Sequence, residues 1–335
     1  MPALAIRVQD LHKRYEGRGG PVLAVNGLDL EVPEGECFGL LGPNGAGKTT
    51  TIEILEGLNG PTSGEVEVLG MSWRDRPDEI RQRIGVTLQE TRFPDKATVE
   101  ELVTLFRSFY RSGIEPAEAI RQVQLESKAN AYNETLSGGQ QRRLAVALAL
   151  VGDPELTFFD EPTTGLDPQS RRQLWEVIRA LRDRGKTTVL TTHYMDEAEK
   201  LCDRIAIVDL GKVIALGSPA DLIARLGGEH VVEFGLLDSE NPAPDGSAFA
   251  DLPTVIASRP EADGYTLTVG EPHLAIPALL DRVDSLGHAL ARLTTRHVSL
   301  EDVFVSLTGR HLRDGDESAD KPDNSARKRR WGRRG

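Results

Sequence analysis

Cysteine is scarce in this chain of 335 residues, and long hydrophobic runs are absent. Two cysteines, Cys37 and Cys202, cannot build a disulfide scaffold or a four-ligand zinc site, and their apolar surroundings predict core positions. The most apolar stretch, residues 144–151, is far shorter than the roughly 20 residues that span a bilayer. Because the first residues also lack the basic and apolar regions of a signal peptide, we expect a cytosolic chain that reaches a membrane only through another chain.

The balance of charge is acidic. Lysine and arginine together number 40, against 52 aspartate and glutamate residues, which gives a net charge of −12 and a pI near 5.2. This composition lacks the basic face that whole-molecule binding to nucleic acid needs. With 39% hydrophobic and 27% charged residues the chain is typical of globular proteins, and its length favours about two domains.

Short apolar strands alternate with helical stretches over the first two thirds of the chain. Strands are expected at residues 28–32, 37–41, 65–69, 84–88, 156–159, 188–191 and 205–208, with helices between several of them, as at 99–111 and 171–184. This rhythm predicts an α/β domain with a largely parallel sheet. The segment 156–159 is continuously hydrophobic, as expected of a strand that is covered on both faces.

Composition divides the chain into three segments. Gly227 and Gly228 mark a boundary, so we expect one domain over residues 1–228. Residues 229–310 are expected to form a small α+β domain with three or four strands and two helices. Residues 311–335 begin acidic, end in a basic run and are expected to be a disordered charged tail.

A glycine-rich turn with the pattern G-x-x-x-x-G-K-[ST] follows the strand at 37–41 and opens a helix at 49–58. Its residues are Gly42, Pro43, Asn44, Gly45, Ala46, Gly47, Lys48 and Thr49, and we add Thr50 to the nucleotide site. Glycines let backbone N–H groups turn toward an anion, and the helix N-terminus adds partial positive charge. Lys48 supplies a full charge toward the β- and γ-phosphates, and the Thr49 hydroxyl is a ligand for Mg²⁺. A turn that only caps the helix is the alternative, which the flanking strand and helix disfavour.

Two carboxylates, Asp160 and Glu161, directly follow the hydrophobic strand. In open α/β sheets, ligands bind at the carboxyl ends of the strands. Asp160 is therefore suited to hold Mg²⁺ through a water, and Glu161 is suited to polarise the attacking water. Acids that simply leave the sheet into solvent are the alternative, which the glycine turn makes weaker.

A third motif, Leu136-Ser137-Gly138-Gly139-Gln140, resembles the signature of ATP-binding-cassette (ABC) ATPases. It lies between the glycine turn and the acidic strand end, in that family's order, and the resemblance covers about residues 4–227. It implies a P-loop ABC nucleotide-binding domain with a RecA-like core, an antiparallel β subdomain and a helical subdomain. The small C-terminal α+β domain follows it.

Four further assignments come from the resemblance. Tyr15 matches the aromatic residue that stacks on adenine, and Gln89 matches the glutamine that joins Mg²⁺ to the transport-coupling surface. Gly165-Leu166-Asp167 matches the loop that crosses the dimer interface, and His193 matches the switch histidine near the γ-phosphate. Three of the four have a plainer alternative: Tyr15 as a packing residue at a sheet edge, Gln89 as a surface loop residue and His193 as a satisfied histidine at a strand end.

The segment Ser137-Gly138-Gly139 precedes a helix at 140–150 and is a second helix N-terminus that can bind an anion. In the family, both phosphate-binding ends close on one nucleotide only when two cassettes pack head to tail. The resemblance therefore implies a homodimer or a dimer with a related subunit, with ATP and Mg²⁺ bound and with Lys48, Glu161 and His193 in catalysis. A serine N-cap followed by glycines is the alternative.

Three functions compete for a chain with these motifs. The first is the ATPase subunit of a membrane transporter, an exporter of drugs or other hydrophobic compounds. The second is a soluble ABC-type ATPase that remodels a macromolecular complex, and the third is a P-loop kinase or another NTP-driven switch. The third leaves residues 136–140 unexplained. The second usually brings two cassettes, a long coiled coil or zinc modules, and none is visible in the sequence.

The C-terminal end refines the transporter hypothesis. Residues 300–309 are similar to the end of daunorubicin-resistance-type exporter ATPases, which pair with a separate membrane-spanning permease. The resemblance implies a position on the cytoplasmic face of the cell membrane, held by the permease, with no nucleic acid as partner. Residues 229–310 could regulate the ATPase or only stabilise its dimer. The basic run at 327–334 could contact anionic lipid or could remain a solvated terminus.

Overall fold

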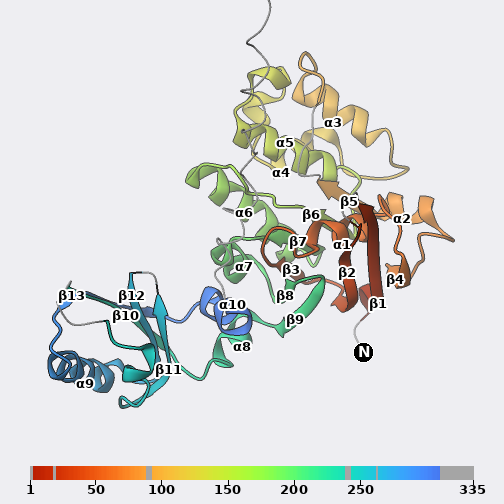
Figure 1. Ribbon diagram of the computed structural model, residues 1–335. Helices are drawn as coiled ribbons and strands as arrows, with labels where there is room; N and C mark the ends of the chain where they lie inside the picture. Colours follow the sequence, from red (N-terminus) through yellow and green to blue (C-terminus); the bar gives the residue numbers. More distant parts are fainter. Residues whose placement is uncertain (1–2, 18–19, 88–92, 238–242, 262, 310–335) are drawn as a thin grey trace, which may run out of the picture.

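The computed structural model describes residues 3–17, 20–87, 93–237, 243–261 and 263–309. Gln89 and the tail at 311–335, which the sequence singled out, lie outside these residues. The described chain contains a six-stranded sheet and two smaller antiparallel sheets, with helices packed between and around them (Figure 1).

The six-stranded sheet has the order β5-β6-β7-β3-β8-β9. Its first five strands run parallel, and β9 is antiparallel to β8. The strands are β3 (Cys37–Leu41), β5 (Ile84–Thr87), β6 (Leu156–Phe159), β7 (Thr187–Thr192), β8 (Arg204–Asp209) and β9 (Lys212–Gly217). The largely parallel sheet is thus as predicted. Every residue of β6 is buried, as predicted for a strand covered on both faces, and the same holds for β3 and β7.

An antiparallel sheet of order β2-β1-β4 packs against the six-stranded sheet. It consists of β1 (Leu4–Gly17), β2 (Gly20–Pro33) and β4 (Ser63–Val68). The sequence predicted β2 and β4 in part but not β1, whose short burial alternation is broken by bulges in its pairing with β2. Together with α1 (Lys48–Leu55), this sheet encloses one hydrophobic core.

Helices cover the other face of the six-stranded sheet and form a helical subdomain. Their bounds are α3 (Val99–Arg107), α4 (Pro116–Gln122), α5 (Gly138–Leu150), α6 (Pro168–Asp183), α7 (Met195–Leu201) and α8 (Pro219–Ala224). A further helix, α2 (Pro77–Arg83), lies on the first face, where its Ile80 joins the core beneath the antiparallel sheet. The predicted helix at 171–184 starts earlier, at Pro168, because the Asp167 carboxylate caps it by accepting hydrogen bonds from two backbone N–H groups. Cys37 and Cys202 are both free and buried in this second core, as predicted.

A third sheet, of order β11-β12-β10-β13, lies apart from the others in Figure 1. It contains β10 (His230–Leu236), β11 (Val255–Glu261), β12 (Gly264–Val269) and β13 (Leu290–His297), and α9 (Pro272–Ser285) covers one face. The last helix, α10 (Leu300–Thr308), does not join this core. Its Leu300, Val303 and Phe304 pack into the core of the N-terminal part, beside α7 and α8.

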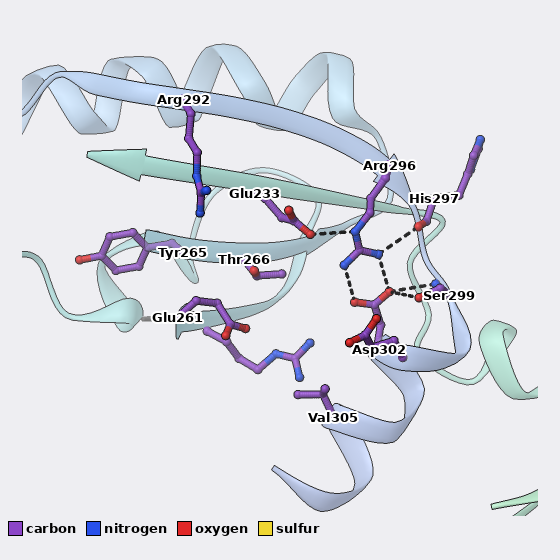
Figure 2. Close-up of a pocket in the computed structure, with 12 residues that line it drawn as sticks. Glu233, Glu261, Tyr265, Thr266, Arg292, Arg296, His297, Ser299, Asp302 and Val305 are labelled. Carbon is purple, nitrogen blue, oxygen red and sulfur yellow. Dashed lines mark hydrogen bonds and ion pairs between the residues drawn. The ribbon is translucent and has the colours of Figure 1, made fainter. Parts of the chain in front are cut away.

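The face of this sheet opposite α9 borders α10 across a cavity of about 400 Å³ (Figure 2). Arg296 of β13 joins the two: its Nε donates to Glu233 Oε1 at 2.7 Å, and Nη1 and Nη2 donate to the two carboxylate oxygens of Asp302 at 2.7 and 2.9 Å. Asp302 is buried, and burial alone would raise its pKa. The hydrogen bonds from Arg296 and from the Ser299 backbone outweigh this effect, so the pKa of Asp302 is lowered.

We predict that Arg296→Ala destabilises the chain by about 2 kcal/mol at neutral pH, because Asp302 is left buried without its cation. A carboxyl whose folded pKa is lowered stabilises the fold above its unfolded pKa, and this contribution is lost as the pH falls through the folded value. The deficit of the variant should therefore shrink as the pH falls and Asp302 is protonated. Urea unfolding at several pH values measures it. Arg282→Ala, which breaks an exposed pair with Asp251, is the control and should cost less; an equal, pH-independent loss in both variants would contradict the prediction.

Candidate active site

The glycine turn leaves the end of β3 and enters α1, as predicted. Gly45 and Gly47 have φ values of 79° and 101°, which side chains rarely allow, and Gly47 occupies the N-cap of α1. A Cβ on Gly42 would lie 2.2 Å from the Val208 carbonyl oxygen, and one on Gly47 would lie 2.4 Å from that of Ala24. Only glycine therefore fits at these two positions. No acidic residue lies in the first turn of α1, so its N-terminus is free to attract an anion.

Lys48 turns back over this loop. Its side chain is buried, and Nζ donates to the carbonyl oxygens of Gly42 at 2.7 Å and Pro43 at 3.2 Å. The ammonium is thus held at the loop itself. Thr49 is exposed and Thr50 half-buried on the same first turn of α1.

Asp160 and Glu161 are both buried where β6 ends. Thr191, at the matching position of the adjacent strand β7, links them: its hydroxyl donates to Asp160 Oδ1 at 2.5 Å and accepts from the Glu161 backbone N–H at 2.8 Å. Burial raises the pKa of Asp160, and the hydrogen bond from Thr191 only partly opposes this shift. A cation beside Asp160 would favour its charged form.

Three side chains of the site surround the Glu161 carboxylate. His193 Nδ1 lies 3.3 Å from Oε1, Lys48 Nζ lies 3.9 Å from the same oxygen, and the Thr164 hydroxyl donates to Oε2 at 3.1 Å. The neighbouring imidazole of His193 is the largest cause that lowers the pKa of Glu161; burial opposes it, and Lys48 supports it. The carboxylate is therefore ionised at neutral pH and ready to accept a hydrogen bond.

The signature segment forms the N-terminus of α5. Ser137 is the N-cap: its hydroxyl accepts from the Gln140 N–H at 3.3 Å, and the Gln140 side chain accepts from the Ser137 N–H at 2.9 Å. A Cβ on Gly139 would lie 2.2 Å from Ser170 Oγ of α6, whereas one on Gly138 would meet no atom within 4 Å. The serine N-cap named as the alternative is thus present, here as part of a capping box, and Gly138 presents an open backbone beside it.

Tyr15 stands at the far end of β1. Its hydroxyl accepts a hydrogen bond from Asn59 Nδ2 at 2.6 Å, and Lys13 Nζ lies 5.0 Å from the ring centroid. The side chain is partly exposed, so adenine stacking on it stays a prediction. Two further site residues, Thr191 and Thr164, were missed from the sequence, which carries no motif for either.

Comparison with known proteins decides the family. Residues 25–164 match the family described as ABC transporter. The chain is 40% identical over 319 residues to the Nod factor export ATP-binding protein I of Burkholderia lata, covering 94% of this chain and 100% of that protein. The chain belongs to the ABC transporter ATP-binding family. The protein of the same name from Cupriavidus metallidurans is 42% identical over 317 residues, covering 92% of this chain and 99% of its own.

Solved ABC cassettes share the fold. The dimeric bacterial ABC transporter cassette MJ0796 aligns with a TM-score of 0.58 and 28% identity, over 64% of this chain and 98% of its own. The protein cbiO1 from Clostridium perfringens, part of the complex cbiONQ, aligns with a TM-score of 0.58 and 25% identity, over 66% of this chain and 91% of its own. This ABC chain is thus an ATP-binding and ATP-hydrolysing subunit of a membrane transporter, and none of these relatives favours the soluble remodelling ATPase. No helix among the described residues is long and apolar enough to cross a bilayer.

Proposed function

We propose that Glu161 orients the attacking water and accepts its proton, and that Lys48 and His193 hold the γ-phosphate. The observation that carries this proposal is the approach of Lys48 Nζ and His193 Nδ1 to one oxygen, Glu161 Oε1. A triphosphate that enters between them meets two donors beside the base that activates water. Lys48 would then exchange its loop carbonyls for phosphate oxygens.

The remaining nucleotide contacts follow the elements of the site. The phosphates would bind the backbone of α1 and the preceding turn, at Gly42, Pro43, Asn44, Gly45, Ala46, Gly47, Lys48, Thr49 and Thr50. We assign the adenine to Tyr15, whose position at the end of β1 leaves its ring partly exposed.

The oxygen ligands here suit Mg²⁺. Thr49 offers an exposed hydroxyl and Asp160 a buried carboxylate whose charge lacks full compensation, and Mg²⁺ prefers such hard ligands together with phosphate oxygens. We propose Thr49 and Asp160 as its protein contacts, with Gln89 as a third. No group of three His, Cys, Asp or Glu side chains in the described part of the chain could hold a metal alone, which agrees with a site that phosphate completes. The ion would offset the negative charge of the phosphates.

We propose a homodimer in which Ser137, Gly138, Gly139 and Gln140 of one copy face the nucleotide of the other. The open backbone at Gly138, in the first turn of α5, supports this arrangement. The Asp167 loop would lie at the same interface, because Ser170 bonds the Asp167 carboxylate and packs on Gly139. MJ0796, which shares this fold, is described as dimeric.

We further propose export as the direction of transport, with a separate membrane-spanning permease as partner at the cytoplasmic face of the cell membrane. Two relatives that match nearly their whole length are named export ATP-binding proteins, which supports this direction. The daunorubicin-type subfamily remains our proposal from the motif at 300–309, with drugs or other hydrophobic compounds as cargo.

The domain division that we propose keeps residues 1–228 as the ATPase domain, 229–310 as the accessory domain and 311–335 as the tail. The last helix of the accessory domain, α10, packs on the ATPase domain and anchors the accessory domain there. Leu300 N–H donates to Glu199 of α7 at 2.9 Å, and α7 directly follows His193 and Tyr194.

His193→Ala tests the hydrolytic assignment. We expect kcat to fall about 10²-fold while the nucleotide Kd changes by less than about threefold, because the side chain acts on the water and γ-phosphate rather than on the whole nucleotide. Steady-state ATPase assays and titration with a fluorescent ATP analogue measure the two constants. His273→Ala, on the exposed face of α9, is the matched control and should retain the parental values. Parental kcat in His193→Ala would remove His193 from the site.

A further inference from the structure

Arg142 connects the signature helix to the catalytic strand end. It lies in α5, two residues after Gln140, and its partly buried guanidinium reaches the backbone beyond β6. Nη2 donates to the carbonyl oxygens of Asp160 and Glu161, each at 2.7 Å, and Nε donates to that of Pro162 at 2.9 Å. One planar side chain thus holds three consecutive peptide units.

The backbone that Arg142 holds is strained. Glu161 has a φ of 44°, in the left-handed region that residues other than glycine rarely adopt. Its N–H donates to Thr191 and its C=O accepts from Arg142, so both peptide groups beside its Cα are fixed from outside β6. Such backbone conformations persist only where several surrounding contacts hold them, and they often occur at functional sites.

We propose that Arg142 is the positioning residue for Glu161 and that it transmits nucleotide contact at the signature turn to the carboxylate of the same chain. The second half rests on the proposed dimer, in which Ser137–Gly139 touch the ATP of the partner. Arg142 follows Gly138 by one helical turn, and the capping box of Ser137 and Gln140 makes this first turn a stiff unit. Movement of the turn on closure therefore moves the guanidinium and, with it, the Glu161 peptide.

This connection couples the two ATP sites of the dimer. The signature of one chain senses the nucleotide bound to the partner, whereas its Arg142 sets Glu161 in its own site. Hydrolysis should then depend cooperatively on ATP, since each site is correctly arranged only when the other is filled.

The chain offers a matched control one residue away. Arg143 lies on the same helix and is more deeply buried, and its Nη1 donates to the carbonyl oxygens of Val123 at 3.0 Å and Gln124 at 2.9 Å. It therefore ties α5 to the end of α4 in the way that Arg142 ties α5 to the strand end. Its removal tests the general cost of losing a buried guanidinium from α5.

The experiment compares Arg142→Ala, Arg142→Lys and Arg143→Ala with the parental chain. It measures kcat, KM and the Hill coefficient for ATP, the Kd of a fluorescent ATP analogue and the midpoint of thermal unfolding. For Arg142→Ala we expect kcat to fall about 10- to 100-fold, the Kd to change by less than about threefold and the Hill coefficient to fall toward 1. Arg142→Lys should stay low, because one ammonium cannot hold three carbonyls. Arg143→Ala should keep kcat within about threefold of the parental value, even if its midpoint of thermal unfolding falls as far as that of Arg142→Ala.

Parental kcat and cooperativity in Arg142→Ala would overturn the inference, and so would full recovery in Arg142→Lys, since charge alone would then suffice. An equal loss of kcat in Arg142→Ala and Arg143→Ala would reduce Arg142 to a structural role. Should Arg142→Ala fail to fold, Arg142→Lys carries the same comparison. Light scattering of Glu161→Gln with ATP separates this inference from the dimer. A monomer would contradict the proposed dimer and with it the coupling, whereas a dimer combined with parental Arg142→Ala kinetics would contradict the role of Arg142 and leave the dimer standing.

Discussion

Glu161→Gln should lower the ATPase kcat about 10²- to 10³-fold while ATP still binds. The amide keeps the shape of the side chain and its contact with Thr164, but it cannot accept a proton from water. The substitution also removes a negative charge from beside Lys48 and His193, so the site becomes more attractive to the triphosphate. A steady-state phosphate-release assay and a nucleotide-binding titration measure the two effects.

The control for this variant is Glu155→Gln, which removes an exposed carboxylate just before β6. Glu155 pairs with Arg83 at 2.6 Å and lies outside the site, so parental kcat is expected. If Glu161→Gln hydrolysed ATP at the parental rate, Glu161 would not be the residue that activates water.

The second large effect is expected from Lys48→Ala, which should raise the Kd for ATP at least about tenfold, equivalent to about 1.4 kcal/mol. Lys48 is the only charged residue of the glycine turn, and its buried ammonium is already held at the loop where phosphates would bind. A charged donor to phosphate contributes more than a neutral one, so the N–H groups of α1 cannot replace it.

Titration with a fluorescent ATP analogue measures this loss. Lys186→Ala, which breaks a surface pair with Asp153, is the control and should bind ATP as the parental chain does. Unchanged affinity in Lys48→Ala would mean that the nucleotide does not bind in the glycine turn.

The sequence was most informative where a function needs adjacent residues. The glycine turn, the acidic pair and the signature segment are each contiguous, and the flanking strand or helix could be predicted beside them. Thr191 could not be found in this way. It lies 31 residues from Asp160, and only the parallel pairing of β6 with β7, which sets Phe159 beside Leu190, brings it to the site.

The C-terminal helix shows a second limit of the sequence. The apolar side chains of α10 predict a buried face but do not say which core it joins. The sequence placed this helix with the strands from residue 229 onward, whereas Leu300, Val303 and Phe304 pack with the helices that follow His193. Register and long-range packing, rather than local pattern, decide such contacts.

The mass of Glu161→Gln in solution tests the central claim most directly, because that claim is that two copies of the chain enclose each ATP. With ATP, multi-angle light scattering should give twice the 36.6 kDa of one chain, and with ADP it should give one chain. Adding Ser137→Arg to the same chain should abolish the ATP-dependent dimer while the Kd for ATP stays close to that of Glu161→Gln. A monomer that retains bound ATP, or a dimer that Ser137→Arg leaves intact, would contradict the account.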